Sequence, residues 1–158
     1  MYKYESTLKG VIYLGIRIRR WLFFIITVTT ALFLCWQDSG GSTELTLKIC
    51  GAIINLFSKI GFKIGFTTNF YYVVRKLGHF IAFILLAISS YLVANSTIKN
   101  LRTAIVLPII IDVVIVLATE CIQAFLPGRI FSAMDLYIDT MGVLVGATIS
   151  MWVINNAL

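Results

Sequence analysis

Charged residues are scarce in this chain, and their scarcity excludes a water-soluble fold. Only 13% of its 158 residues are charged, whereas 59% are apolar. A soluble domain carries about 25% charged residues, so this chain has too few to cover a surface in water. Intrinsic disorder is excluded as well, because disordered segments have low hydrophobicity. The composition therefore predicts an integral membrane protein, with residues 1–158 in a single membrane domain.

Residues that build metal or redox sites are also few. The chain has one histidine and three cysteines, Cys35, Cys50 and Cys121. The cysteines lack the CxxC spacing of zinc and thioredoxin-like sites, and no HExxH-type ligand spacing is present. We expect no metal and no cofactor, and we expect each cysteine to pack as a small apolar residue.

Basic residues outnumber acidic residues by 13 to 7, yet they do not indicate a nucleic-acid partner. They lie in clusters beside apolar runs. Such positions are typical of topology determinants and of contacts with lipid headgroups. We therefore expect membrane lipids as partners and no nucleic acid.

Four apolar runs are long enough to cross a membrane, because a transmembrane helix takes about 20 residues. The third run contains Pro108, which can kink a helix, and it is expected to continue helically to Phe125. Its central Asp112 either hydrogen-bonds to a backbone or Thr group or acts as a proton relay in a small transporter. The predicted spans cover about residues 16–36, 77–94, 101–118 and 136–154.

The segment 45–66 differs from these runs because lysines interrupt it. Lys48, Asn55, Lys59 and Lys63 share one helical face, with isoleucines largely opposite. Such a helix tends to lie in the membrane interface, and a fifth, weakly hydrophobic span is the alternative. A polar turn is expected before it, at residues 37–44. The predicted fold class is an all-α, polytopic membrane helix bundle with four transmembrane helices plus one interfacial amphipathic helix.

The distribution of Lys and Arg predicts how the chain crosses the membrane. The count is nearly balanced between the two faces, so the basic segment before the first span decides. It contains Lys3, Lys9, Arg17, Arg19 and Arg20. We expect a multi-pass protein with both termini on the cytoplasmic side.

Polar residues gather at three places that an antiparallel bundle brings to one membrane face: the start of the second span, the end of the third, and the turn and start of the fourth. The predicted orientation makes this face extracytoplasmic. Because charges in a bilayer are costly, we consider these residues a candidate ligand-binding group. They are Arg75, Lys76, His79, Glu120, Gln123, Arg129, Asp135 and Asp139.

Helical spacing places these side chains on common faces. Glu120 and Gln123 are three residues apart and share a face. A second stripe, in the fourth span, begins with carboxylates and continues with glycines that let a neighbouring helix approach closely. Its members are Asp135, Asp139, Gly142 and Gly146. The alternative to a binding group is a purely structural one, in which acids and bases neutralise each other.

In order and spacing, these residues resemble the VanZ-like family of bacterial membrane proteins over about residues 36–147. One departure is Asp139, where the family often has Asn. The resemblance implies a bacterial cytoplasmic membrane protein with a cell-envelope role, linked in the family's name to resistance to the glycopeptide teicoplanin. It rests on Lys76-x-x-His79-Phe80, Glu120-x-x-Gln123-x-Phe125, Pro127-Gly128-Arg129 and Asp135-x-x-x-Asp139-x-x-Gly142-x-x-x-Gly146.

Two functions are compatible with this group. In the first, which is not enzymatic, the basic side chains bind phosphate or carboxylate of a lipid-linked wall precursor or of a lipoglycopeptide. In the second, an intramembrane enzyme acts on a phosphate-bearing envelope lipid, with His79, Glu120 and Asp135 as candidate catalytic residues. We favour binding, because membrane phosphatases use a second histidine that this chain lacks. The sequence leaves the ligand and the oligomeric state open.

Overall fold

The computed structural model describes residues 2–36, 39–63 and 65–157, and this part of the chain contains helices and no strands. The predicted all-α class is thereby confirmed for the described residues. Five helices follow one another, and their bounds are α1 Tyr2–Trp36, α2 Ser39–Lys59, α3 Thr68–Thr97, α4 Leu101–Ala124 and α5 Ala133–Ala157.

Three of these helices are long and apolar enough to cross a membrane: α3, α4 and the part of α5 up to Val153. The predicted first span, 16–36, lies within α1, and its crossing of the membrane stays a prediction. The helices α1, α3, α4 and α5 are each longer than the predicted span that they contain, because hydropathy marks the apolar stretch and not the hydrogen-bonded turns beyond it. The helix α3 begins nine residues before the predicted start, where Thr67 caps it by accepting a bond from the Phe70 amide at 3.1 Å.

The predicted bounds of the amphipathic segment were wrong at both ends. Residues 39–44, expected as part of a polar turn, already belong to α2, where Glu44 pairs with Lys48 one turn later at 2.7 Å. The helix ends at Lys59 and not at 66, because Gly61 adopts a left-handed φ of 88°. The amides of Gly61 and Phe62 then bond back to the carbonyls of Ser58 and Phe57. Residues 37, 38 and 64 lie outside the described residues.

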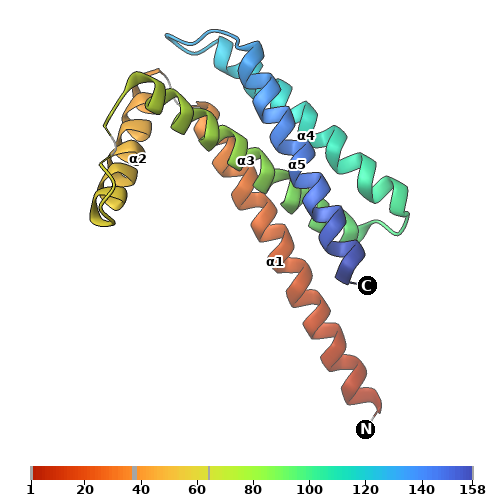
Figure 1. Ribbon diagram of the computed structural model, residues 1–158. Helices are drawn as coiled ribbons and strands as arrows, with labels where there is room; N and C mark the ends of the chain where they lie inside the picture. Colours follow the sequence, from red (N-terminus) through yellow and green to blue (C-terminus); the bar gives the residue numbers. More distant parts are fainter. Residues whose placement is uncertain (1, 37–38, 64, 158) are drawn as a thin grey trace.

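The helix α3 is the centre of the molecule and packs against each of the other four helices. Figure 1 shows that the two ends of the chain and the α3–α4 connection lie at one end of the bundle, and the α4–α5 loop lies at the other. The helix α2 lies to one side and packs against the start of α3, where the Tyr71 hydroxyl donates to Thr43 Oγ1 at 3.3 Å. Cys50 is fully buried on α2, whereas Cys121 is exposed on α4.

The glycine stripe of α5 faces α3, as its spacing predicts. A Cβ atom added to Gly142 would lie 2.7 Å from the carbonyl oxygen of Phe80. Only glycine permits so close an approach of two helix backbones. The successive contacts along the two helices advance in the same direction, so α3 and α5 pack side by side and parallel. The central core cluster lies around this contact and consists of Phe83, Leu86, Ala87, Val116 and Val143.

Candidate functional site

The start of α3, the end of α4 and the start of α5 meet at one end of the bundle, beneath the α4–α5 loop (Figure 1). The prediction that polar residues from these three places are neighbours is confirmed. Five of them are almost completely buried, with exposed fractions of 7% or less. These are His79, Glu120, Gln123, Asp135 and Asp139.

Two pairs join α3 to α5 on successive turns. Lys76 Nζ donates to Asp135 Oδ1 nearest the end of the bundle. One turn deeper, His79 Nδ1 lies 3.6 Å from Asp139 Oδ2, which is ion-pair distance but longer than a hydrogen bond. The spacing of three residues on α3 and four on α5 keeps each base opposite an acid.

The α4–α5 loop is tied to the end of α4 by two polar contacts. Glu120 Oε2 accepts a hydrogen bond from the Ser132 amide at 3.2 Å, and Gln123 Oε1 accepts one from Arg129 Nη1 at 3.1 Å. Gly128 makes the turn possible, because its φ of 71° is left-handed. The loop geometry therefore holds Arg129 over the end of α4.

A hollow of about 380 Å³ opens between the start of α3 and this loop. Five of the predicted ligand residues line it, whereas His79, Glu120 and Asp139 lie outside its wall. The cluster thus has two layers, with three cations at the hollow and two of the three carboxylates behind them. The five lining residues are Arg75, Lys76, Gln123, Arg129 and Asp135.

Sequence reasoning missed several residues of the hollow. Tyr72 lines it one turn before Lys76, and Ser132 lines it from the loop. Ser132 also accepts a bond from the Asp135 amide at 3.2 Å, as a helix N-cap does. A Ser three residues before an Asp at the start of an apolar run is a helix-start signal that could have identified it. The remaining wall includes Ile130 and Phe131, which are 84% and 50% exposed.

Several buried polar atoms of the cluster have no hydrogen-bond partner among the described residues. Buried polar groups are nearly always hydrogen-bonded, so an N–H of this set can donate to an acceptor or anionic oxygen of a ligand, and a carboxylate oxygen can accept from a ligand hydroxyl or amide. Of this set, Arg75 Nε and Gln123 Nε2 belong to residues that line the hollow. The set includes Arg75 Nε, Glu120 Oε1, Gln123 Nε2 and both Oδ atoms of Asp139.

The basic side chains at the hollow are suited to binding an anion. Among the described residues, no group of three His, Cys, Asp or Glu side chains is placed to hold a metal ion. The three cations at the hollow instead offer guanidinium and ammonium donors, which bind phosphate and carboxylate groups through charge-assisted hydrogen bonds.

Asp112 lies apart from this cluster, in the middle of α4. It is 1% exposed, and its Oδ2 accepts a hydrogen bond from Ser90 Oγ of α3 at 2.6 Å. The expectation of a backbone or Thr partner was therefore wrong in detail. A hydroxyl from the facing helix satisfies part of the carboxyl group, and Asp112 links α3 to α4.

The family model described as VanZ/LLP1 matches residues 18–154, a range that contains the whole cluster and most of the five helices. Comparisons with curated proteins and with solved structures find no significant match.

Proposed function

Because this chain belongs to the VanZ-like family, we propose that it is a cell-envelope membrane protein that binds an anionic, lipid-linked component of the bacterial wall. The binding lowers the access of a glycopeptide such as teicoplanin to its target. The site is the hollow at the start of α3, on the extracytoplasmic face of the cytoplasmic membrane, with both termini in the cytoplasm.

The observation that carries this proposal is the position of Arg75. Its Nε atom is buried without a hydrogen-bond partner among the described residues, and the side chain lines the hollow beside Lys76 and Arg129. Buried guanidinium groups need an anionic or acceptor partner. Asp135 is the only carboxylate of the described residues in the wall of the hollow, and it is paired with Lys76. A diphosphate or carboxylate group of a ligand supplies the partner.

The apolar part of the wall favours a ligand that is anchored in the membrane. Ile130 and Phe131 line the hollow and are largely exposed, and Met134 beside them is 62% exposed. Exposed apolar side chains next to cations suit the boundary between lipid headgroups and acyl chains. A lipid carrier places its charged headgroup and its hydrocarbon chain in these two environments at once.

The placement of His79 favours binding over catalysis. Its ring lies outside the wall of the hollow and faces Asp139. A general acid or base must come within hydrogen-bond reach of the reacting group. The position of His79 therefore gives less support to an enzyme that acts on a phosphate-bearing lipid than to a binding protein.

Binding of a polyprenyl diphosphate to the purified protein tests the proposal, with the uncharged polyprenol as the control ligand. We expect the diphosphate to bind at least about tenfold more tightly, because phosphate contacts to Arg are charge-assisted. The double variant Arg75→Gln, Arg129→Gln should lose this preference while remaining folded. The double variant Arg19→Gln, Arg102→Gln, an equal change in charge at the opposite end of the bundle, should keep it.

The same variants are then expressed in a glycopeptide-susceptible bacterium. The wild-type protein should lower susceptibility to teicoplanin and the double variant should not. Equal binding of diphosphate and polyprenol, or an unchanged phenotype in the folded double variant, contradicts the proposal. Release of phosphate from the ligand would instead identify an enzyme.

A further inference from the structure

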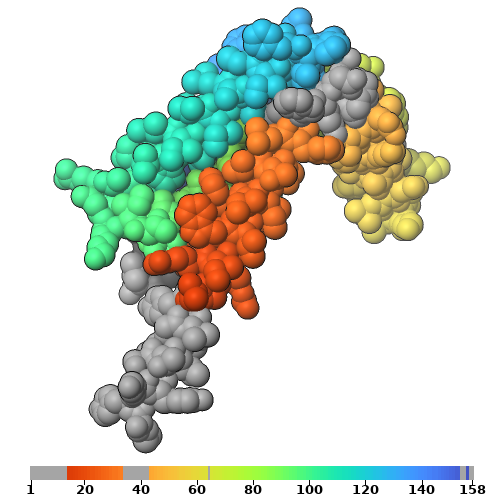
Figure 2. Space-filling view, turned by 180° about the vertical axis from the view of Figure 1, so that it is seen from behind, coloured from red at the N-terminus to blue at the C-terminus, as the bar shows by residue number. Residues whose placement is uncertain are grey.

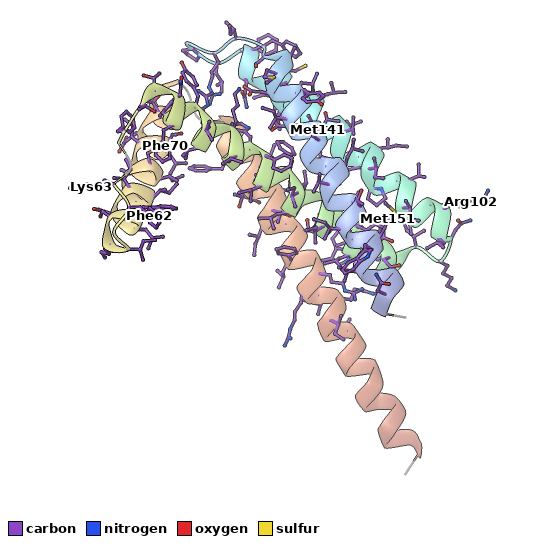
Figure 3. All side chains as sticks on the ribbon, viewed as in Figure 1. Phe62, Lys63, Phe70, Arg102, Met141 and Met151 are labelled. Atoms are coloured by element: carbon purple, nitrogen blue, oxygen red, sulfur yellow. The ribbon has the colours of Figure 1, made fainter. Side chains whose placement is uncertain are left out.

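At the end of the bundle opposite the candidate site, the side chains that the structure describes carry basic charge without acidic charge. No Asp or Glu occurs in residues 14–33 of α1 or in residues 91–111, which contain the α3–α4 connection. Figure 3 shows Arg102 at the start of α4, projecting away from the bundle. A positive surface at a membrane face attracts anionic lipid headgroups. Its basic residues are Arg17, Arg19, Arg20, Lys99 and Arg102.

Two of these five residues line a hollow of about 430 Å³ between α1 and the α3–α4 connection. They are Arg17 and Lys99. Arg17 Nη2 donates to the carbonyl oxygen of Ser96 at 3.4 Å, which holds the guanidinium against the last turn of α3. The other nitrogen atoms of the guanidinium remain available for an anionic group.

An apolar groove of about 220 Å³ continues from this hollow along the bundle. Thr97 and Ile98 belong to the walls of both. The groove lies where α1 and α4 run side by side, as Figure 2 shows in orange and in green to cyan. Trp21 of α1 and Leu107 of α4 form its opposite sides and are 43% and 41% exposed, so the groove opens laterally toward lipid.

We propose that the hollow and the groove together form a binding site for one anionic phospholipid of the surrounding bilayer. The lipid phosphate lies between Arg17 and Lys99, and one acyl chain lies in the groove between Trp21 and Leu107. Charge complementarity selects an anionic headgroup, and the groove selects a ligand with a hydrocarbon chain. No residue of this site belongs to the candidate site at the other end of the bundle, so a result that contradicts one proposal leaves the other unaffected.

Retention of phospholipids by the full-length protein tests this site. The purified protein is mixed with phosphatidylglycerol and phosphatidylcholine of identical acyl chains, and bound lipid is measured by native mass spectrometry. The wild type should retain phosphatidylglycerol preferentially. In the double variant Arg17→Gln, Lys99→Gln the preference should fall on the order of tenfold, because each cation near a charged lipid surface contributes appreciably to binding.

The matched control is the double variant Arg19→Gln, Arg102→Gln. It removes the same charge from the same end of the bundle, at positions that do not line the hollow, and it should retain the preference. For the groove, Leu107→Trp should reduce retention of both lipids. Val106→Trp, on the exposed neighbour that does not line the groove, should not.

Three outcomes overturn the proposal. They are equal retention of the two lipids by the wild type, equal loss in both double variants, and an unchanged preference in the Arg17, Lys99 variant. If that variant fails to fold, the charge-conserving double variant Arg17→Lys, Lys99→Arg is measured instead. It should keep the preference for phosphatidylglycerol, and loss of that preference contradicts the proposal.

Discussion

Gly146 of α5 lies so close to Ile84 of α3 that a Cβ atom at position 146 would stand 2.5 Å from the Ile84 carbonyl oxygen. This contact continues the line that begins at the Lys76–Asp135 pair and passes through His79 and Asp139. One helix–helix seam therefore both orients the polar cluster and joins the two membrane-spanning helices.

Gly146→Ala should destabilise the protein by about 1–3 kcal/mol, because the added methyl group meets backbone and must separate the helices. The matched control is Gly78→Ala in the same α3–α5 region. A Cβ at Gly78 meets nothing within 4 Å, so alanine should leave stability unchanged or raise it by about 0.5–1 kcal/mol. Thermal unfolding in detergent, followed by circular dichroism, measures both. Equal midpoints for the two variants would contradict the close packing.

Lys76→Met should lower stability, because it leaves Asp135, which is 5% exposed, without its cation. Breaking a fully buried pair costs about 3–5 kcal/mol, and we expect about 2 kcal/mol here, since Lys76 keeps 31% of its side chain exposed. The double variant Lys76→Met, Asp135→Asn should recover most of the loss. A double-mutant cycle of unfolding free energies measures the coupling.

The exposed pair Glu44–Lys48 of α2 is the control for this cycle. Its side chains are 70% and 71% exposed, and solvent-exposed ion pairs contribute little to stability. Lys48→Met should cause no measurable change. Additive effects of Lys76→Met and Asp135→Asn would mean that the buried pair does not stabilise the fold.

Much of the fold could be predicted from the sequence, because apolar runs and short connections determine it. The connection between α3 and α4 spans residues 98–100, so the two helices must be antiparallel neighbours. The start of α2 at Ser39 and its end at Lys59 were not predicted. Hydropathy reports where a segment is apolar, whereas these bounds depend on backbone hydrogen bonds and on the left-handed Gly61.

The composition of the polar cluster was also predictable, but its layering was not. Helical spacing places Lys76 and His79 on one face of α3, and the structure confirms their acidic neighbours on α5. Whether a side chain lines the hollow depends on the path of the α4–α5 loop. That path follows from the hydrogen bond between Glu120 and the Ser132 amide, a contact that sequence spacing does not reveal.

Ser90→Ala should destabilise the protein by about 1–3 kcal/mol, the cost of leaving a buried polar group unsatisfied. The Ser90 hydroxyl bonds to Asp112 Oδ2, and the other oxygen of Asp112 has no hydrogen-bond partner among the described residues. The double variant Ser90→Ala, Asp112→Val should be more stable than Ser90→Ala alone, because no buried carboxyl group remains. Thermal midpoints in detergent provide the comparison.

Ser89→Ala, at the adjacent position, which is also buried, should destabilise the protein less than Ser90→Ala. The Ser89 hydroxyl lies 2.7 Å from Thr27 Oγ1. The Thr27 hydroxyl also lies within hydrogen-bond distance of the Phe23 and Phe24 carbonyls of α1. No polar group of Thr27 is therefore left unpaired in the variant. A larger effect at Ser89 than at Ser90 would contradict the role assigned to Asp112.

The predicted orientation can be tested by cysteine labelling in intact cells, with the three native cysteines replaced. Ile130→Cys lies in the α4–α5 loop and is 84% exposed, whereas Lys99→Cys lies in the α3–α4 connection at the other end of the bundle. A membrane-impermeant maleimide should label position 130 from outside and position 99 only after permeabilisation. The reverse pattern would place the candidate site in the cytoplasm.

Labelling at Lys63→Cys decides between an interfacial α2 and a fifth span. Figure 3 shows Lys63 projecting outward beside the far end of α2. The start of α2 lies beside the start of α3, through the Tyr71–Thr43 hydrogen bond, so both begin at the face of the candidate site. If α2 lies in the interface, position 63 is labelled from the same side as position 130. Labelling from the side of position 99 would mean that α2 crosses the membrane.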